Sequence, residues 1–264
     1  MKAMQQLLEI MQQLRDPQRG CPWDRQQTYR SLVPYTLEEA YEVADAIEQD
    51  ELEHLPDELG DLLFQVVFYA QIGREEGRFD FDEVARRISE KLIRRHPHVF
   101  ADEKIESAES QTQAWERHKQ KEREQKAGRQ AIGVLQGVSL ALPALSRAAK
   151  LQRRAARVGF DWPAIDGVVA KVHEELEELK DEIRAEPDRQ RLQEELGDLL
   201  FACVNLARHL ELDAETALRQ ANTRFEHRFR QMELALQAKG GIERAGSGEM
   251  DAAWEEAKQG DKAR

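Results

Sequence analysis

Residues 57–64 read Asp-Glu-Leu-Gly-Asp-Leu-Leu-Phe, and residues 194–201 read Glu-Glu-Leu-Gly-Asp-Leu-Leu-Phe. A second pair of matching segments precedes them, Glu-Glu-Ala-Tyr-Glu at 38–42 and Glu-Glu-Leu-Glu-Glu at 174–178. The spacing of the two segments nearly agrees: Glu58 lies 16 residues after Glu42, and Glu195 lies 17 residues after Glu178. Similar segments in the same order indicate an internal repeat. The sequence therefore predicts two copies of one domain rather than one large bundle.

Apolar residues at helical spacing surround these segments. The spacing predicts a helix over 36–49 that begins with a capping box, Thr36 as the N-cap and Glu39 at the third position, and another helix from Pro56 to about Gly73. The remaining predicted helices cover residues up to 14, the segment between Asp80 and Pro97, and residues 142–158, 165–185, 188–210 and 213–238. Four helices joined by short connections are typical of a bundle. The predicted fold is all-α, with tandem four-helix-bundle-like repeats.

The boundary between the copies is predicted from composition. Residues 119–126 read Lys-Gln-Lys-Glu-Arg-Glu-Gln-Lys, which is nearly all charged, and three glycines follow by residue 137. Charge without apolar spacing, followed by glycine, is typical of a linker. We expect an N-terminal domain over 1–120, a linker over 121–137 and a C-terminal domain over 138–264.

The chain is acidic. Its 264 residues carry 39 Lys and Arg against 51 Asp and Glu, a formal net charge of −12, and 41% of them are hydrophobic. That apolar content is sufficient for folded cores, whereas binding to nucleic acid or an anionic membrane needs a basic surface. No apolar stretch approaches the roughly 20 residues of a membrane span, and the N-terminus lacks the apolar core of a signal peptide. We expect a cytoplasmic protein that binds neither nucleic acid nor membrane.

The repeated acids favour a metal site. Residues three apart on a helix project to the same side, so Glu39 and Glu42 point together, as do Glu58 and Asp61. Short connections make the two helices antiparallel neighbours, so the four carboxylates can converge. The second copy repeats the set with Glu175, Glu178, Glu195 and Asp198. Clustered oxygen ligands suit a hard divalent ion, Mg²⁺ with Mn²⁺ as a possible substitute, and Mg²⁺ often binds substrate phosphates as well.

A solvated acidic face is the alternative for a single copy of this motif, because buried acids are rare. The recurrence of both motifs in order favours the metal site. In addition, residues 64–69 (Phe-Gln-Val-Val-Phe-Tyr) place apolar side chains around the whole helix circumference, which is typical of a helix buried on all sides. We expect another subunit or the other repeat to cover this helix, which predicts a homo-oligomer.

At these residues the sequence resembles the MazG family of nucleoside triphosphate pyrophosphohydrolases. Besides the paired acid motifs, the resemblance rests on Cys-Pro-Trp-Asp at 21–24, Arg-His-Pro-His-Val-Phe at 95–100 and Gly-Phe-Asp-Trp at 159–162. It covers nearly the whole chain, the tandem arrangement included. The resemblance implies the all-α NTP pyrophosphatase fold, which is related to that of dimeric dUTPases, and a homodimer.

The resemblance also implies an activity, the Mg²⁺-dependent hydrolysis of nucleoside triphosphates of several bases to the monophosphate and pyrophosphate. Carried over by motif, the metal ligands are Glu175, Glu178, Glu195 and Asp198, with Glu39, Glu42, Glu58 and Asp61 as their counterparts. The C-terminal copy is expected to carry most of the hydrolysis, although both acid sets are intact.

Further candidates follow from that chemistry. Either Glu174 or Glu175 acts as the base, and the sequence does not choose between them. Phosphate-binding cations are expected nearby, and the candidates are Lys171, Arg224, Arg228 and Lys258. Trp254 either stacks on the nucleobase or anchors the C-terminal tail to the core.

Two other classes of protein compete with this interpretation. A ferritin-like di-metal protein needs Glu-x-x-His motifs on two helices, and the one such spacing, Glu51 to His54, has no counterpart in the second copy. A non-catalytic helical interaction module does not explain the paired motifs. A Walker-type NTPase is excluded because no Gly-Lys-Ser/Thr occurs.

Overall fold

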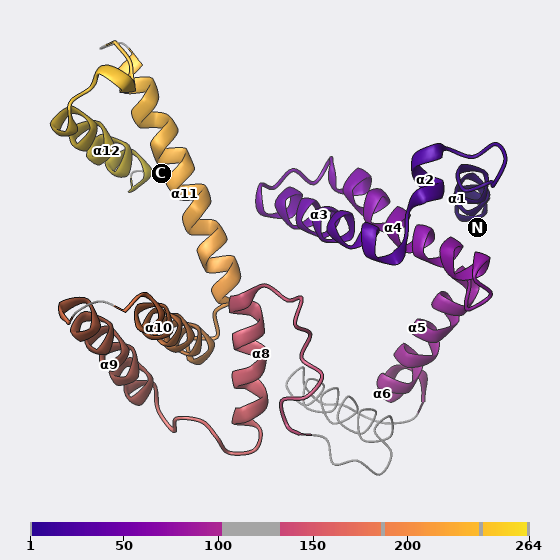
Figure 1. Ribbon diagram of the computed structural model, residues 1–264, viewed down its shortest axis with the longest axis horizontal. Coiled ribbons are helices and arrows are strands. Elements are labelled where there is room, and N and C mark those ends of the chain that lie inside the picture. The colour runs from indigo at the N-terminus through magenta and orange to yellow at the C-terminus, as the bar shows by residue number, and fades with distance from the viewer. Residues whose placement is uncertain (1, 102–132, 186–187, 238–239, 263–264) are drawn as a thin grey trace. The chain divides into compact units, whose positions relative to one another are not determined.

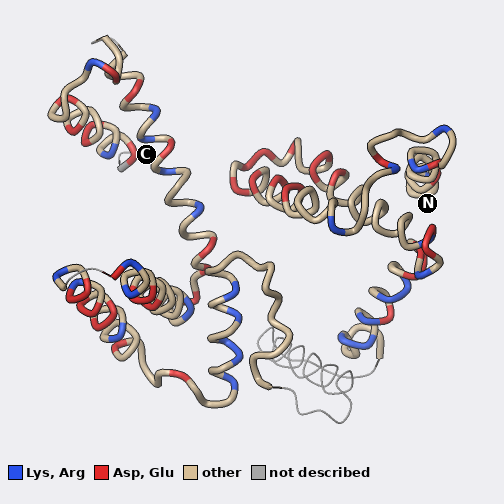
Figure 2. Tube along the Cα trace, in the orientation of Figure 1, with Lys and Arg blue, Asp and Glu red and all other residues tan. Residues whose placement is uncertain are grey.

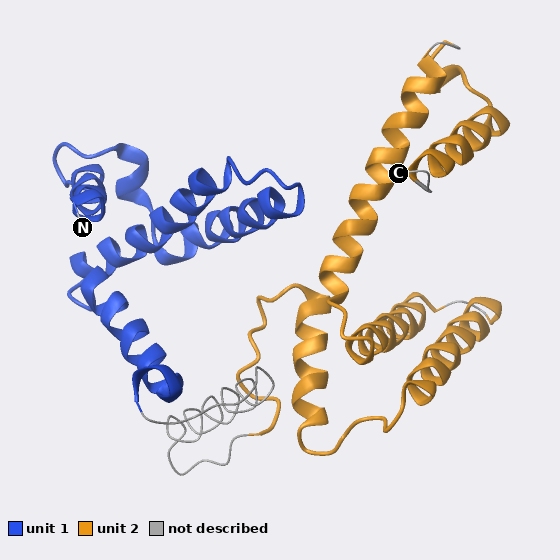
Figure 3. Cartoon of the chain, turned by 180° about the vertical axis from the view of Figure 1, so that it is seen from behind, with its two compact units in different colours: residues 1–126 blue, residues 127–264 orange. Residues whose placement is uncertain are grey.

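A computed structural model describes residues 2–101, 133–185, 188–237 and 240–262 (Figure 1). Every regular element in these ranges is a helix, which confirms the prediction of an all-α protein. None of these helices combines the length and the apolarity that a membrane crossing needs. The chain divides into two compact units, residues 1–126 and 127–264 (Figure 3). Most of the predicted linker, residues 121–132, lies outside the described residues, and the predicted domain boundaries stay predictions.

Unit 1 is built around one long helix. Its elements are α1 (Lys2–Leu14), α2 (Pro22–Gln26), α3 (Tyr29–Glu48), α4 (Leu55–Glu75), α5 (Phe81–Arg95) and α6 (Pro97–Phe100). Helix α3 runs back along α4, and α1 and α5 also contact α4. The buried core consists of Met11, Leu32, Val67, Phe68 and Ile72. Helix α4 therefore presents side chains to α1 and α3 at once, with its acidic first turn beside α3.

Helix α3 begins earlier than predicted. Its N-cap is Thr28, whose hydroxyl accepts from the Ser31 backbone N–H while the Ser31 hydroxyl accepts from the Thr28 N–H. Thr36, the predicted cap, lies inside the helix, and its Oγ1 is 2.8 Å from the Tyr69 hydroxyl and 3.0 Å from the Leu32 carbonyl. The capping prediction was wrong because Pro34 is accommodated within the helix, where it removes one backbone hydrogen bond.

Unit 2 repeats the long helix pair and adds a hairpin. Its elements are α8 (Ala144–Ala156), α9 (Ile165–Arg184), α10 (Arg189–His209), α11 (Ala214–Gln237), the 3₁₀ turn η1 (Ile242–Arg244) and α12 (Ser247–Lys262). Helices α8 and α9 pack on α10, with Ala148, Ala149 and Val204 buried between α8 and α10. Helix α12 folds back on α11 around a separate core of Met232, Leu236 and Ala253. In Figure 1 this hairpin extends away from the α9–α10 pair.

Apolar side chains remain exposed on the long helix pairs. On α4, Val67 and Phe68 are fully buried, but Leu59 is 48% exposed. Within the single chain, α1, α3 and α5 therefore leave part of the α4 surface uncovered, and its burial on all sides by another subunit or the other repeat stays a prediction. Exposed apolar side chains also occur on α3 and α10, among them Leu37, Tyr41, Ile47, Leu196, Leu200 and Phe201.

Candidate active site

Each unit brings three carboxylates together. Glu39, Glu42 and Glu58 form the unit 1 acid cluster, and Glu175, Glu195 and Asp198 form the unit 2 acid cluster. Within each cluster, one ligand atom of every residue lies within 4.8 Å of the others. Both clusters join adjacent antiparallel helices, α3 with α4 and α9 with α10, and Figure 2 shows acidic residues gathered along these pairs.

The fourth predicted ligand of each set lies outside its cluster but remains electrostatically coupled to it. In unit 1 the negative charge of Asp61 helps to raise the pKa of Glu39. In unit 2 the pKa of Glu178 is raised by desolvation and then by the charge of Glu175. The structure thus assembles three of the four predicted carboxylates and keeps the fourth nearby.

The unit 1 cluster concentrates negative charge. Desolvation raises the pKa of Glu39, as do a hydrogen bond with Glu42 and the charges of Asp61, Glu42 and Glu38. The amide of Gln65, which is buried on α4, lies 3.5 Å from the Glu39 carboxylate. Across the described ranges, no Lys or Arg forms an ion pair with an acid of this cluster. A cation bound there would relieve the repulsion.

The unit 2 cluster is partly compensated by the chain's own cations. The Lys171 Nζ lies 2.8 Å from carboxylate oxygens of both Glu174 and Glu175, and these contacts raise the pKa of Lys171. Glu175 is only 6% exposed, so this pairing stabilises its buried charge. Arg191 donates from Nη2 to Glu195 at 2.8 Å. Two of the three clustered acids are therefore held in place by a neighbouring cation.

This compensation is a difference between the two copies. Tyr35 stands four residues before Glu39, where unit 2 has Lys171 four residues before Glu175. His54 likewise occupies the position that Arg191 has in unit 2. The repeat conserves the acids but supplies permanent positive charges at these positions only in unit 2. The role of Arg191 was not apparent from the sequence, since an Arg one turn before a Glu is common on exposed helices.

A cavity of about 360 Å³ adjoins the unit 2 acid cluster. Glu175, Asp198 and Lys171 are among the residues that line it. The remaining wall is mostly apolar or aromatic and includes Leu151, Ala155, Phe160, Trp162, Val168 and Phe201. Pockets that combine an apolar wall with a few charged groups are typical of small-molecule sites. The cavity thus offers both charged groups and aromatic surface to a ligand.

Three polar residues of the cavity wall were not predicted from the sequence: Gln152, Asn205 and Arg208. Arg208 donates to Asp161, within the 159–162 segment that contributed to the family resemblance, and also to the Asn205 Oδ1. Sequence spacing does not reveal these contacts because Asp161 and Arg208 are 47 residues apart.

The aromatic wall depends on a glycine. A Cβ added to Gly167 in the first turn of α9 would lie 2.6 Å from the Trp162 ring. The missing side chain lets the indole rest against the helix.

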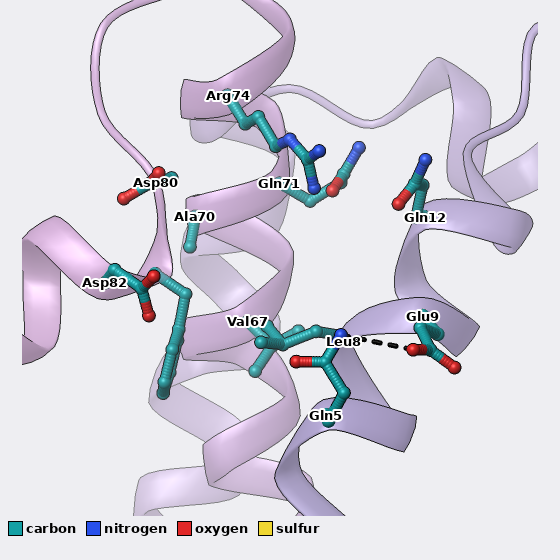
Figure 4. A pocket seen from close by; sticks show the side chains of 11 residues that line it. Gln5, Leu8, Glu9, Gln12, Val67, Ala70, Gln71, Arg74, Asp80 and Asp82 are labelled. Atoms are coloured by element: carbon teal, nitrogen blue, oxygen red, sulfur yellow. Dashed lines mark hydrogen bonds between the residues drawn. The ribbon is translucent and has the colours of Figure 1, made fainter.

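Unit 1 has a hollow of about 320 Å³ elsewhere, between α1, α4 and the start of α5 (Figure 4). Arg74, Gln71 and Asp80 lie around it, and Gln5 donates to Glu9 at its edge. None of the clustered acids of unit 1 lines this hollow.

The other predicted substrate-binding residues lie on the α11–α12 hairpin. Arg228 donates from Nε to Asp261 at 2.7 Å, and Lys258 donates to Glu255 at 2.8 Å. The Trp254 ring lies 5.4 Å from that of Phe225 and packs on the hairpin core. Together with Arg224, these residues are absent from the cavity lining, whereas the predicted Lys171 is part of it. Trp254 thus anchors the tail helix within the single chain.

The ion pair between Asp161 and Arg208 predicts that the stability of the protein depends on pH in the acid range. Hydrogen bonds from Arg208 and then His209, against the opposing effect of burial, lower the pKa of Asp161 from 3.8 to about 2. A lowered folded-state pKa contributes stability above pH 4, about 1 kcal/mol once screening by solvent is allowed for, and this contribution is lost as the pH falls towards 2. In urea titrations, the stability difference between wild type and Asp161→Asn should shrink from pH 5 to pH 2.5. A difference that stays constant over this range would contradict the assignment.

The fold and the site define a class: an all-helical protein whose tandem helix pairs each carry a carboxylate cluster suited to a cation, with a cavity beside the cluster of unit 2. Comparison with known proteins agrees. The family model described as the MazG nucleotide pyrophosphohydrolase domain matches residues 27–100 and 165–232, which contain both acid clusters. The chain belongs to the MazG family.

Similar proteins extend along nearly the whole chain. A nucleoside triphosphate pyrophosphohydrolase of Escherichia coli (strain K12) is 54% identical over 241 residues, 91% of this chain and 90% of the relative. The nucleoside triphosphate pyrophosphohydrolase/pyrophosphatase MazG of Thermotoga maritima is 45% identical over 258 residues, covering 97% and 96% of the two chains. An uncharacterized protein of Bacillus subtilis, YabN, is 42% identical over 95% of this chain and 50% of its own length.

Proposed function

We propose that this MazG protein hydrolyses nucleoside triphosphates of several bases to nucleoside monophosphates and pyrophosphate, using Mg²⁺ or, in its place, Mn²⁺. The observation that carries the proposal is the cavity of unit 2, whose lining combines Glu175, Asp198 and Lys171 with aromatic side chains. Such an arrangement suits a charged triphosphate joined to a planar base. The names of the Escherichia coli and Thermotoga maritima relatives support the same reaction. Since these substrates are metabolites of the cytoplasm, we place the enzyme there.

The residues present fit the proposed cation. Glu175, Glu195 and Asp198 offer carboxylate oxygens within 4.8 Å of one another, and Glu178 lies close enough to interact with Glu175. Oxygen donors in this number are the preference of Mg²⁺ and Mn²⁺. When bound, the ion neutralises phosphate charge and lowers the pKa of a water molecule. The unit 1 acids Glu39, Glu42 and Glu58, with Asp61 beside them, offer the same chemistry, and among the described residues no Lys or Arg is ion-paired with the clustered three.

The chain's own groups then have defined tasks. Water attack on the α-phosphorus forms a new P–O bond and breaks the bond to the leaving pyrophosphate, and the proton of the water needs an acceptor. We assign that role to a carboxylate of the Glu174–Glu175 pair, whose two members share Lys171. Lys171 lies at the cavity wall and can donate to a phosphate oxygen as well as to these acids.

A product assay tests this reaction. ATP, GTP, CTP and UTP incubated with the protein and Mg²⁺ should each yield monophosphate and pyrophosphate in equal amounts. Excess EDTA should abolish the release, and Mg²⁺ or Mn²⁺ added afterwards should restore it, because the proposed ligands are reversible carboxylates. Release of orthophosphate, or turnover that survives EDTA, would contradict the proposal. Chromatography separates the products, so a contaminating phosphatase is recognised by its orthophosphate.

We further propose that the enzyme works as a homodimer in which a second copy completes each site. Two observations support this: the apolar side chains left exposed on α10, and the location of Arg224, Arg228, Lys258 and Trp254 on a hairpin outside the cavity of their own chain. Burial of such apolar surface drives association. A partner's hairpin would also supply the arginines that a triphosphate needs.

Subunit mixing tests the homodimer. Glu175→Gln chains and Arg224→Ala chains should each be weakly active, but co-refolded mixtures should recover up to about a quarter of wild-type activity, because half of the dimers are mixed and each of these has one intact site. Sedimentation of the wild type should show a dimer at micromolar concentration. A monomer, or mixtures no more active than their components, would contradict the shared site.

A further inference from the structure

A buried amide on the cavity wall has an unused hydrogen-bond acceptor. Gln152 lies on the face of α8 that lines the unit 2 cavity, together with Leu151 and Ala155, and its side chain is only 7% exposed. Its Nε2 donates to the Phe201 carbonyl at 2.8 Å, while its Oε1 has no hydrogen-bond partner. A buried acceptor left without a donor is costly, and in a native protein it calls for an explanation.

The identity of that free atom follows from its neighbour. The Phe201 carbonyl can only accept a hydrogen bond, so the amide nitrogen of Gln152 must face it and the oxygen must be the atom without a partner. Exchanging the two atoms would set two acceptors against each other. The Gln152 Oε1 is therefore a fixed, unpaired acceptor on a residue that lines the cavity.

A second buried amide supplies the complementary donor. Asn205 on α10 also lines the cavity and is 4% exposed. Its Oδ1 accepts from Arg208 Nε at 3.0 Å and from Nη2 at 2.7 Å, so its nitrogen remains the donor. Arg208 is in turn held by Asp161. The cavity wall thus combines one fixed acceptor, one oriented amide donor, and the aromatic rings of Phe160 and Trp162.

This combination matches a nucleobase. We propose that the α8 side of the cavity binds the base and that Gln152 is a specificity residue whose Oε1 accepts a hydrogen bond from a base N–H. The inference rests on the proposed function, because the acid cluster and Lys171 would take the triphosphate of the same ligand. Every common base presents an N–H beside an acceptor on its pairing edge, so an amide pair selects bases as a class without choosing one. This agrees with the breadth of substrates proposed above.

A ligand lacking the N–H tests the contact directly. Purine riboside 5′-triphosphate is ATP without its 6-amino group and has no N–H on its base. Wild type should use ATP about tenfold better in kcat/KM, since a buried acceptor is left unpaired by the analogue. Gln152→Met, of similar volume but without the amide, should lower kcat/KM for ATP to the level of the analogue. The loss should appear mainly in KM, and the value for the analogue should change little.

The control is Gln13→Met in unit 1, an exposed glutamine seven residues before Gly20, as Gln152 is seven residues before Gly159. This variant should have the wild-type kcat/KM for both ATP and the analogue. Circular dichroism of each variant checks folding. The base contact is overturned if Gln152→Met lowers kcat/KM by the same factor for ATP and for the analogue, or if wild type has equal kcat/KM for both. Neither result would contradict the proposed hydrolysis. If wild type releases no pyrophosphate from any nucleoside triphosphate, the proposed function itself fails.

Discussion

Glu175→Gln is expected to reduce pyrophosphate release at least about 100-fold, whereas Glu39→Gln should reduce it less than about threefold. The substitution keeps the size of the side chain but removes the charge from the most buried acid of the unit 2 cluster. Lys171 retains Glu174 as a partner, so the local packing should survive. The difference between the units is expected because the described cavity adjoins the unit 2 cluster, whereas the hollow of unit 1 is lined by none of its clustered acids.

Steady-state kinetics with Mg²⁺ at several concentrations measure this difference. If Glu175 is a cation ligand, part of the activity of Glu175→Gln should return at high Mg²⁺, and isothermal titration should show weaker cation binding to that variant. Glu38 is an exposed acid next to Glu39 on α3. Glu38→Gln therefore serves as the control for loss of one negative charge in Glu39→Gln. Equal losses in Glu39→Gln and Glu175→Gln would mean that both copies hydrolyse the substrate, contrary to our assignment.

Phe68→Ala should lower the stability of unit 1 by about 3–5 kcal/mol, the usual cost of removing a fully buried aromatic side chain. Phe68 is at the centre of the unit 1 core and packs edge-on against Phe64 at 5.6 Å between ring centroids and Trp23 at 6.5 Å. The Arg15 guanidinium lies 5.5 Å from the ring centroid. The truncation therefore removes contacts that join α1, α2 and α4.

Urea unfolding followed by amide hydrogen exchange locates this effect. Peptides of α1 to α4 should lose protection at lower urea in Phe68→Ala, while peptides of α8 to α10 should be unchanged, because the two units have separate cores. Leu52→Ala, at a side chain that is 57% exposed, should cost less than about 0.5 kcal/mol. Simultaneous loss of protection in both units would show that they unfold as one body.

Local patterns were sufficient for much of the fold. The predicted helix over 165–185 is α9, Ile165–Arg184, and the predicted helix over 188–210 is α10, Arg189–His209. Helical periodicity and capping act over a few residues, so they can be predicted from the sequence. The same short range explains the error at Thr36. Its local pattern is compatible with an N-cap, but the helix begins earlier, with Thr28 as its N-cap.

For the acid motifs, local spacing predicts the candidate ligands, and helix packing decides which of them come together. Spacing of three on adjacent antiparallel helices is a local property, and it was enough to select eight carboxylates as candidate ligands. Which three approach within 4.8 Å in each unit depends on the rotation and offset of two packed helices, and that left Asp61 and Glu178 beside the clusters rather than in them.

The sequence by itself determined the helices, the repeat, the family and the candidate ligands, because these follow from periodicity and from motifs within single segments. Only the tertiary structure decided that Gln152, Asn205 and Arg208 meet the unit 2 acids around a cavity, and that Arg228 and Lys258 lie on a separate hairpin. The reason is that a cavity is bounded by segments distant in sequence, here α8, α9 and α10. Its lining depends on how those helices pack, which no pattern within one helix records.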